Sequence, residues 1–475
     1  MEFDKLTIKE YANKIKNKEF SAEEGVKFFV QRIKEDKHNA VLEVFKDAID
    51  QAKAVDKKVL KGEKLGRLAG VPIIIKDNIL FYGHIASAGS KMLEKFNAPY
   101  SSTIVNKMLA EDAIIIGRAN MDEFGMGSTG ENSEYGATHN AYKMGCVAGG
   151  SSSGSAVAVA AGLCVAAIGT DTGASVRAPA SYNGLFAIKP TYGSTSRYGI
   201  VAYASGLEQA GAVCKTAEDT ELLQSIISGE DEFDGTLKCC EVIKKQFDIK
   251  KLKIGYVKEI WKNKEVIQDF DKFQKLFDWF KSQGAEIKEI SIPHLDLCLP
   301  AYYIIAMAEA TSNLSRYDGV KYTSAVEGSK NLDELYKKTR SKFFGEEVRR
   351  RITLGNFVLS SGYFDQYYGK AKKIQSALKQ EFIDSLTEVD CLLLPITLSD
   401  ALNIGEKTTD PLEMYMEDLF TVPANVTGVP ALAIPFEKGR KGLPIGFQML
   451  GAHFNDSLLF EVAKYFEKNN GGVKC

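Results

Sequence analysis

The chain opens with apolar residues at helical spacing, each block preceded by a polar start signal. Thr7 with Glu10, and Ser21 with Glu24, both fit the capping box, in which a hydroxyl and a carboxylate satisfy the first free N–H groups of a helix. Apolar residues then recur every three or four positions. We therefore predict a helical N-terminal arm over residues 1–65.

From about residue 70 onward, short β-branched apolar runs alternate with longer helical patterns. Alternation of this kind favours an α/β fold around a large, mostly buried mixed sheet. No repeat or low-complexity linker interrupts the pattern, so we expect a single domain over residues 1–475. The predicted strands cover residues 71–75, 113–117, 164–168, 252–257, 285–290, 431–435 and 445–450, and the predicted helices cover residues 104–109, 155–161, 266–280 and 458–466.

Composition and charge exclude several classes of protein. The formal net charge of −2 predicts no strongly basic nucleic-acid surface. No apolar run reaches the roughly 18 residues of a membrane span, and the polar start MEFDKLTIKE is unlike a signal peptide. We expect a cytoplasmic protein, bacterial or organellar, without membrane contact. Eight scattered cysteines and five isolated histidines lack metal-ligand spacing, so reduced thiols and no metal site are expected.

The most informative stretch is rich in glycine and serine: Gly149-Gly-Ser-Ser-Ser-Gly-Ser155, followed by Asp171-Thr-Gly-Ala-Ser-Val-Arg177. A flexible linker is disfavoured because small and apolar residues continue after it, and a phosphate loop would need a lysine after the second glycine. The Gly-Ser-Ser-Ser-Gly core also matches GxSxG, the nucleophile elbow of α/β-hydrolases, with Ser152 as nucleophile and His294 or His453 as base. The preceding residues make a poor strand, which weighs against that interpretation.

Three segments together resemble the amidase signature family. They read GVPIIIKDN at residues 70–78, GGSSSGSAVAVAAG at residues 149–162, and DTGASVRAPA at residues 171–180. The combination is far more specific than any segment alone. The resemblance implies a three-layer α/β/α fold, amide hydrolysis by a Ser–Ser–Lys triad, and no cofactor in this chain.

The residues that match this triad suit amide cleavage. Ser175 matches the nucleophile, Ser151 the serine of a cis peptide bond that relays the proton, and Lys76 the base. A lysine acts as a base only when it is uncharged, and burial at a strand end lowers its pKa. The resemblance also implies an oxyanion hole made by the backbone N–H groups of Thr172, Gly173, Ala174 and Ser175.

The chain departs from the family pattern at three positions. Ala174 stands where the family has glycine; if that position required a positive φ, alanine would be strained by roughly 1 kcal/mol. Ser153 replaces another usual glycine, and Ala178 replaces a frequent glutamine. All three triad positions are intact, so we expect catalysis. Asp171 and Arg177 are expected to brace the loop and not to react.

Further segments resemble one branch of the family, the A subunits of glutamyl-tRNA(Gln) amidotransferases. They include MDEFGMGSTGE at residues 121–131, KPTYG at residues 189–193 and DLFTVPANVTGVP at residues 418–430. This resemblance implies that the chain is a glutaminase that hydrolyses glutamine to glutamate and ammonia. A B subunit would use that ammonia with ATP and Mg²⁺ to amidate Glu-tRNA(Gln), and a C subunit would tether the two. tRNA would be bound mainly by the B subunit.

The same resemblance assigns the contacts with glutamine. Arg351 would bind the carboxylate and Asp418 the ammonium, with Tyr302 beside them, because a zwitterion needs groups of both signs. Ser128 and Thr129 are expected to line the pocket. Two alternatives stay open: a free-standing amidase of the same family acting on another small amide, and a non-catalytic scaffold subunit, which the intact triad disfavours.

Overall fold

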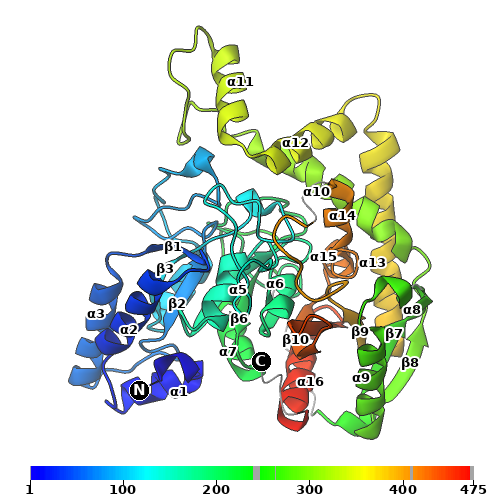
Figure 1. Ribbon diagram of the computed structural model, residues 1–475, viewed down its shortest axis with the longest axis horizontal. Coiled ribbons are helices and arrows are strands. Elements are labelled where there is room, and N and C mark those ends of the chain that lie inside the picture. The colour runs from blue at the N-terminus through cyan, green and yellow to red at the C-terminus, as the bar shows by residue number, and fades with distance from the viewer. Residues whose placement is uncertain (1, 239–246, 263, 407–409, 471–475) are drawn as a thin grey trace.

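A mixed sheet of 11 strands runs across the molecule with helices on both faces (Figure 1). The computed structural model describes residues 2–238, 247–262, 264–406 and 410–470. The strand order is β1-β3-β2-β4-β6-β5-β10-β11-β9-β7-β8. Strand β2 is parallel to β3 and β4, and β7 is parallel to β8 and β9, whereas the other neighbours are antiparallel. The predicted three-layer α/β/α fold with a large mixed sheet is confirmed.

The strands are short, and most are fully buried. Their bounds are β1 (Val41–Val44), β2 (Pro72–Lys76), β3 (Ile114–Ala119), β4 (Ala166–Asp171), β5 (Phe186–Lys189), β6 (Gln209–Cys214), β7 (Lys253–Val257), β8 (Glu286–Ile290), β9 (Cys391–Pro395), β10 (Ala431–Lys438) and β11 (Pro444–Gly451).

The α-helices are α1 (Ile8–Lys16), α2 (Ala22–Glu35), α3 (Ala48–Lys61), α4 (Thr103–Ala110), α5 (Ser153–Ala160), α6 (Arg177–Tyr182), α7 (Ala217–Ile227), α8 (Lys258–Lys262), α9 (Phe270–Ser282), α10 (Cys298–Leu314), α11 (Leu332–Phe343), α12 (Glu346–Leu359), α13 (Lys370–Glu388), α14 (Pro411–Met416), α15 (Val422–Thr427) and α16 (Asp456–Asn469). Short 3-10 turns cover Phe3–Lys5, Lys91–Leu93, Glu123–Gly125, Ile249–Lys251, Lys264–Val266 and Leu295–Leu297, and a π-helical turn covers Asp365–Gly369.

Both predicted capping boxes are present. The Thr7 side chain accepts the N–H of Glu10 while the Glu10 carboxylate accepts the N–H of Thr7, and Ser21 and Glu24 pair in the same way. These reciprocal bonds satisfy orphan donors at the starts of α1 and α2, so both helices begin where the sequence predicts.

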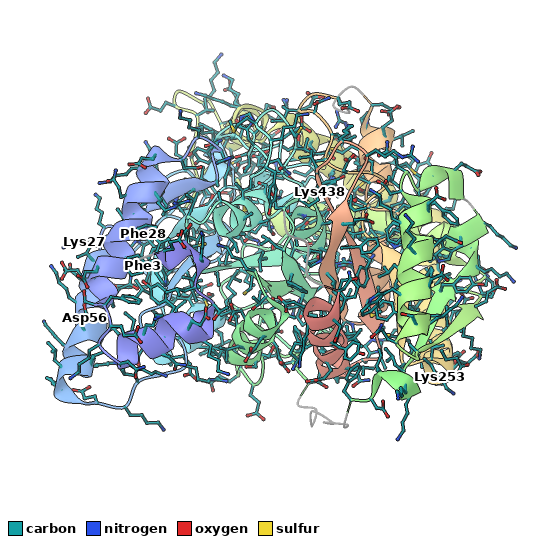
Figure 2. The ribbon with its side chains drawn as sticks, turned by 60° about the horizontal axis from the view of Figure 1, so that its bottom comes forward. Phe3, Lys27, Phe28, Asp56, Lys253 and Lys438 are labelled. Carbon is teal, nitrogen blue, oxygen red and sulfur yellow. The ribbon has the colours of Figure 1, made fainter. Side chains whose placement is uncertain are left out.

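Further contacts hold the N-terminal helices together (Figure 2). The rings of Phe3 and Phe28 lie 5.1 Å apart between centroids. Asp56 on α3 accepts the N–H of Ala22 at 2.7 Å, which ties α3 to the first turn of α2. Apolar side chains of these helices belong to the same buried cluster as the sheet. A single domain over residues 1–475, with residues 1–65 as its arm, stays a prediction.

The first 65 residues also contain a strand that the pattern did not predict. Strand β1 pairs antiparallel with β3 and forms one edge of the sheet. Its sequence, Val-Leu-Glu-Val, is short, and all four residues are only half-buried. Neither the alternation nor the length of a typical strand is therefore visible in the sequence.

The strands that carry the candidate site are well predicted. Strand β2 holds three consecutive isoleucines with every residue buried, as expected for a strand covered on both faces. Strand β4 starts two residues later than predicted and continues to Asp171. Because β2 and β4 are parallel neighbours, their carboxyl ends meet at one edge of the sheet. Lys76 and Asp171 therefore end adjacent strands.

A helical region stands beyond the carboxyl ends of these strands. Helix α10 packs against both α12 and α13, and α11 extends outward at the top of the view (Figure 1). Among the helices in the described ranges, none combines the length and the apolar character that a membrane crossing needs.

Candidate active site

Lys76 lies fully buried at the end of β2. Its ammonium nitrogen, Nζ, is 2.8 Å from Ser151 Oγ, 3.0 Å from Thr170 Oγ1 and 3.3 Å from the Thr170 carbonyl oxygen. Burial lowers the pKa of Lys76 to about 8, against the opposing effect of the nearby Glu208, Asp122 and Asp171 carboxylates. A substantial share of Lys76 is thus uncharged at mildly alkaline pH, which a general base requires.

The Ser151 loop is shaped by two glycines. The peptide bond between Gly150 and Ser151 is cis, and Gly149 has a φ of 77°. A Cβ on Gly150 would lie 1.9 Å from Asp122 Oδ2, so only glycine fits there. The Gly150 N–H donates to the Ser128 carbonyl at 2.8 Å, and the Asp122 N–H donates to the Ser151 carbonyl at 3.2 Å. This backbone frame presents the Ser151 hydroxyl to Lys76.

Ser175 lies on the loop between β4 and α6 and reaches the Ser151 loop through the backbone. The Ser152 N–H donates to the Ser175 carbonyl at 2.9 Å. Lys76 is fully buried, whereas Ser175 keeps 5% of its surface exposed. No hydrogen bond joins the Ser175 and Ser151 hydroxyls in the residues that the structure describes. The Lys76–Ser151 pair is therefore in direct contact, and Ser175 adjoins it.

The loop that carries Ser175 is braced by a buried ion pair. Arg177 donates from Nε and Nη2 to the two oxygens of Asp171 at 3.0 and 2.9 Å, and from Nη2 to the Gly173 carbonyl at 2.9 Å. Burial alone would raise the pKa of Asp171, but Arg177, Asn425 and the Val176 N–H stabilise the carboxylate and lower that pKa to about 2. The loop is thus fixed by a charge that stays ionised across the physiological range.

Four consecutive backbone donors on this loop point to an anion-stabilising role. Within the described chain, the N–H groups of residues 172–175 donate no hydrogen bond. A Cβ on Gly173 would lie 2.4 Å from Tyr302 Oη, so the Tyr302 ring packs directly against this turn. Ala174 is not among the residues with positive φ, so alanine is unstrained there. The strain considered for Ala174 does not arise.

The other departures are also accommodated locally. The Ser153 hydroxyl donates to Thr138 Oγ1 at 3.0 Å. Ala178 lies in α6 and is buried among apolar neighbours.

A second buried cluster lies around Arg351 of α12. Its Nε donates to Glu347 Oε1 at 2.7 Å, and its Nη1 donates to Tyr203 Oη at 2.6 Å. The guanidinium also lies over the rings of Tyr203, Tyr303 and Tyr415, at 5.7, 5.4 and 5.3 Å from their centroids. Its remaining nitrogen, Nη2, is buried without a partner among the described residues. A buried cation with an unsatisfied donor suits an anionic ligand group.

Asp418 lies in the same cluster. Tyr303 donates to its carboxylate at 2.6 Å, and Ser128 hydrogen-bonds to it as well. Burial raises the pKa of Asp418 to about 6, which the Tyr303 and Ser128 hydrogen bonds and the Arg351 charge oppose. Because Ser128 also accepts the N–H of Gly150, it connects this cluster to the Ser151 loop.

Sequence reasoning missed several residues of these clusters. Tyr203 and Glu347 bond to Arg351, and Tyr303 bonds to Asp418. Of these residues, only Arg351 and Asp418 were predicted from the sequence. The spacing of Glu347 and Arg351, four residues apart on one helix, could have indicated the first contact. Thr129 is buried beside Ser128, but within the described residues its side chain makes no hydrogen bond to the site.

The α/β-hydrolase interpretation finds no geometric support. The Ser152 hydroxyl is fully buried and bonds the carbonyl and N–H of Thr170, at 3.1 and 3.3 Å. His453 interacts with the Thr427 carbonyl at 3.1 Å, and His294 pairs with Glu381 at the surface. Neither histidine reaches Ser152.

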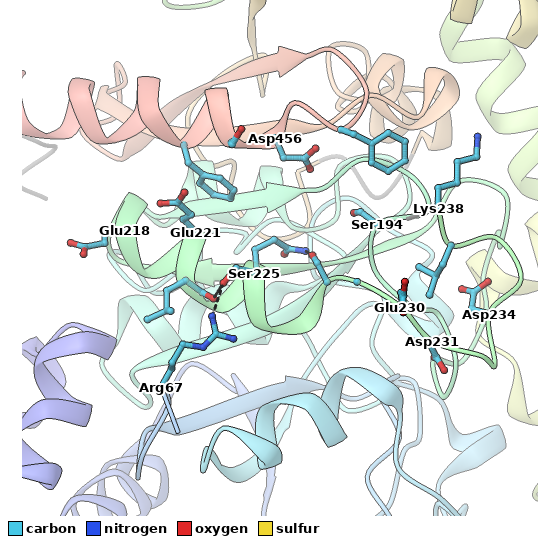
Figure 3. Close-up of a pocket in the computed structure, with 18 of the residues that line it drawn as sticks. Arg67, Ser194, Glu218, Glu221, Ser225, Glu230, Asp231, Asp234, Lys238 and Asp456 are labelled. Carbon is cyan, nitrogen blue, oxygen red and sulfur yellow. Dashed lines mark hydrogen bonds between the residues drawn. The ribbon is translucent and has the colours of Figure 1, made fainter. Parts of the chain in front are cut away.

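A cavity of about 1200 Å³ lies elsewhere, between α1, α7, α16 and residues 228–238 (Figure 3). Arg67 reaches Ser225 there at 3.4 Å. None of the candidate site residues lines this cavity. In the part of the chain that the structure describes, no three His, Cys, Asp or Glu side chains are grouped as metal ligands.

Comparison with known proteins identifies the family to which the Lys76, Ser151 and Ser175 segments belong. The profile of the Amidase family matches residues 24–460. The chain belongs to the amidase family. Among solved amidase-family structures, the native peptide amidase of Stenotrophomonas maltophilia has a TM-score of 0.82 at 25% identity, covering 98% of this chain and 97% of that one.

Within the amidase family, several relatives that share more than 40% of the sequence bear one name. The A subunit of glutamyl-tRNA(Gln) amidotransferase from Fusobacterium nucleatum subsp. nucleatum is 45% identical, covering 98% of this chain and 97% of that protein. The Pelagibacter ubique protein of the same name is 46% identical, covering 98% and 96%. The crystal structure of the Thermotoga maritima protein of that name has a TM-score of 0.79 at 36% identity, covering 98% and 95%. The amidase resemblance and its A-subunit branch are thereby confirmed.

Proposed function

We propose that this chain is the glutamine-hydrolysing A subunit of a glutamyl-tRNA(Gln) amidotransferase. Its nucleophile is Ser175, its proton relay Ser151 and its base Lys76. The observation that carries the proposal is the 2.8 Å contact between the buried Lys76 amine and Ser151, beside the loop of Ser175. Relatives that share 45% and 46% of the sequence over nearly the full length bear that subunit's name.

The reaction begins with proton transfer toward Lys76. The uncharged amine takes a proton from Ser151, and Ser151 takes one from Ser175 as the Ser175 oxygen attacks the side-chain amide carbon of glutamine. Catalytic hydrogen bonds commonly tighten only when substrate is bound, so a missing bond between the two serines in the free chain is compatible with this role. Lysine can act in this way because burial holds the pKa of Lys76 near 8.

The oxyanion of the tetrahedral intermediate is stabilised by backbone donors. The N–H groups of Thr172, Gly173, Ala174 and Ser175 have no other acceptor among the described residues. Donors that are fixed before the reaction cost no reorganisation, and each is worth about 3–4 kcal/mol of transition-state stabilisation. The Arg177–Asp171 pair and the Arg177 bond to the Gly173 carbonyl keep this turn rigid.

Glutamine is recognised by charge at its α-carbon end. The free Nη2 of Arg351 binds the carboxylate, and Asp418 binds the ammonium. Tyr302, Ser128 and Thr129 surround the substrate between these groups and the triad. Collapse of the intermediate breaks the carbon–nitrogen bond, and the proton held at Lys76 returns through Ser151 to the departing nitrogen as ammonia. Water then hydrolyses the acyl group on Ser175 and releases glutamate.

The ammonia serves a partner. In this proposal a B subunit binds ATP, Mg²⁺ and the Glu-tRNA(Gln) and amidates it, and a C subunit tethers this chain to the B subunit. The net charge of −2 agrees with a chain that leaves tRNA binding to its partner.

The test is ammonia release from glutamine by the assembled complex. Ser175→Ala, Ser151→Ala and Lys76→Ala are each expected to lower kcat by at least about 10³-fold, since all act in the same proton transfer. The matched control is Ser155→Ala, because Ser155 is also buried and its hydroxyl donates to the Ile168 carbonyl, away from Lys76 and Ser175. Wild-type activity in the Lys76→Ala variant would overturn the triad.

Membership of a multi-subunit complex has its own readout. We expect the chain to copurify with two further subunits and to prefer glutamine over simple amides. A chain that isolates alone and hydrolyses unrelated amides equally well would identify a free-standing amidase. A complex without any amide hydrolysis would identify a scaffold subunit.

A further inference from the structure

Thr170, the residue before the end of β4, lies between Lys76 and the protein interior. Its hydroxyl oxygen accepts from Lys76 Nζ at 3.0 Å and from Asn78 Nδ2 at 3.1 Å. Its carbonyl oxygen accepts from Lys76 at 3.3 Å. Among the described residues, the atoms that Lys76 bonds apart from Ser151 Oγ both belong to Thr170.

Behind Thr170 lies a carboxylate that the reaction so far does not use. Glu208 directly precedes β6, and its side chain is buried. Thr170 aligns with Ala210 in the β4–β6 ladder, so Glu208, two residues before Ala210, lies on the same side of the sheet as Thr170. Its carboxylate accepts the N–H of Tyr203 at 3.3 Å and interacts with the Thr170 hydroxyl. Glu208 therefore connects Thr170, which bonds Lys76, to Tyr203, whose phenol accepts from Arg351.

Counting donors and acceptors shows what this contact does. A threonine hydroxyl has one hydrogen and two lone pairs. The two lone pairs of Thr170 face Lys76 and Asn78, so its hydrogen is directed to Glu208. A carboxylate can only accept, which prevents the Thr170 hydrogen from turning toward Lys76.

The consequence falls on the amine. An uncharged lysine has two hydrogens and one lone pair. With both oxygens of Thr170 acting as acceptors, the two hydrogens of Lys76 are occupied, and the lone pair faces the third neighbour, Ser151. That is the orientation in which Lys76 can take the proton of Ser151.

We propose that Glu208, acting through the Thr170 hydroxyl, is a positioning residue that directs the lone pair of Lys76 toward Ser151. This inference rests on the proposed function, since it concerns the base of that reaction. Glu208 touches neither the reacting atoms nor the substrate.

Three carboxylates act electrostatically on Lys76: Glu208, Asp122 and Asp171. Asp171 is paired with Arg177, and Asp122 accepts the N–H groups of Gly130 and Asn132 at 3.2 and 2.8 Å. Of these three described carboxylates, Glu208 is the one that reaches Lys76 through a shared hydroxyl, that of Thr170. Asp171 and Asp122 are held by these other partners. Replacing Glu208 therefore tests the contact to Lys76 that passes through the Thr170 hydroxyl.

The first test compares two variants of Thr170 in the assembled complex. Thr170→Ser keeps the hydroxyl, and Thr170→Val keeps the shape without it. We expect kcat for glutamine to stay within about threefold for serine and to fall by about 10²-fold for valine, the scale of general-base catalysis. Equal rates in the two variants would overturn the proposal.

The second test is the pH profile of Glu208→Gln. Removing the negative charge favours the uncharged amine, so the acid limb of kcat/KM moves to lower pH. The plateau rate nevertheless falls at least about tenfold, because a glutamine amide can donate to Thr170 and reverse the hydrogen bonds. The matched control is Glu467→Gln on α16, whose carboxylate accepts the N–H of Ala217 and lies away from Lys76; neither quantity changes there.

A purely structural role for Glu208 would lower the plateau without moving the limb, and that result would overturn the proposal. An acid limb shifted to lower pH with an unchanged plateau rate would overturn it as well. If Glu208→Gln does not fold, the Thr170 pair still decides. Failure of the proposed function gives a different result. Lys76→Ala would then retain glutamine hydrolysis, and the Thr170 and Glu208 variants would not change its rate.

Discussion

At the scale of single residues, the site contains two buried basic side chains whose pKa values shift in opposite directions. Lys76 has only neutral partners within hydrogen-bond reach, so burial dominates and its pKa falls to about 8. Arg351 is bonded to Glu347 and surrounded by three tyrosine rings, and it stays charged. One is suited to accept a proton and the other to bind an anion.

The Lys76 environment predicts the pH dependence of the reaction. Because the uncharged amine is the active form, kcat/KM should rise tenfold per pH unit between about 6 and 8 and level off above 8. Asp418→Asn changes glutamine binding but should leave this limb in place, which provides the control. A rate that is independent of pH between 6 and 9 would contradict the role of Lys76 as base.

Arg351 predicts a change in substrate binding rather than in chemistry. Arg351→Lys keeps the charge but loses the planar fork that bonds Glu347 and Tyr203 and leaves Nη2 free. We expect KM for glutamine to rise about 10- to 100-fold, the value of one charged hydrogen bond, with a smaller change in kcat. For 4-aminobutanamide, which lacks the carboxylate, KM should not change. An equal loss for both amides would contradict carboxylate binding.

Gly173 predicts a steric effect on the oxyanion donors. An added methyl group would lie 2.4 Å from Tyr302 Oη and 2.7 Å from its Cζ, so the turn or the ring must move. Gly173→Ala should lower kcat by about 10²-fold, comparable to losing one donor. Gly362→Ala is the control, because nothing lies within 4 Å of the new methyl group. Steady-state kinetics of both variants checks this, and a normal kcat in Gly173→Ala would contradict the oxyanion role of the turn.

The residue patterns explain what sequence could predict at this scale. Lys76, Ser151 and Ser175 lie in local motifs that share a family pattern, so they were recognisable. Tyr203 and Glu208 lie in no such motif, and they meet Arg351 and Thr170 only through the fold. No local pattern carries information about partners that lie far apart along the chain, and Arg351 lies 148 positions from Tyr203.

At the scale of elements, the two helix starts with a capping box and the strands with β-branched runs were predicted, whereas several other buried elements were not. Helices α1 and α2 begin at capping boxes, whose residues are local. Helix α10 is buried along most of its length, so it lacks the polar face that makes a helix periodic. Strands β5, β6 and β9 are buried at every position like β2, but they lack its run of β-branched residues, so neither alternation nor composition indicates a strand. These elements were therefore missed.

The capping box of α2 predicts a local change in stability. Ser21→Ala removes the acceptor of the Glu24 N–H, a bond of 3.1 Å. N-cap losses cost about 1 kcal/mol, so amide hydrogen exchange in the first turn of α2 should speed up about fivefold. Exchange in α16, which lies on a different part of the sheet, is the internal control. Unchanged exchange at the start of α2 would contradict the cap.

At the scale of the whole molecule, the fold class was predictable but the strand order was not. Strand β10 pairs with β5, with Ala431 opposite Lys189, although more than 240 residues separate the two strands along the chain. The β7–β8 unit joins the far edge through β9. Such crossovers depend on tertiary packing. They bring Arg351 of α12 to Tyr203 and Asp418 to Ser128, which bonds the loop of Ser151.

The central claim is that Ser175 is made nucleophilic by Lys76 for reaction with glutamine. The most direct measurement is peptide mapping by mass spectrometry after exposure of the complex to an electrophilic glutamine analogue. The account predicts a label on Ser175 that disappears in Lys76→Ala and remains in the Ser155→Ala control. A label on Ser152, or none on a folded, assembled complex, would contradict it.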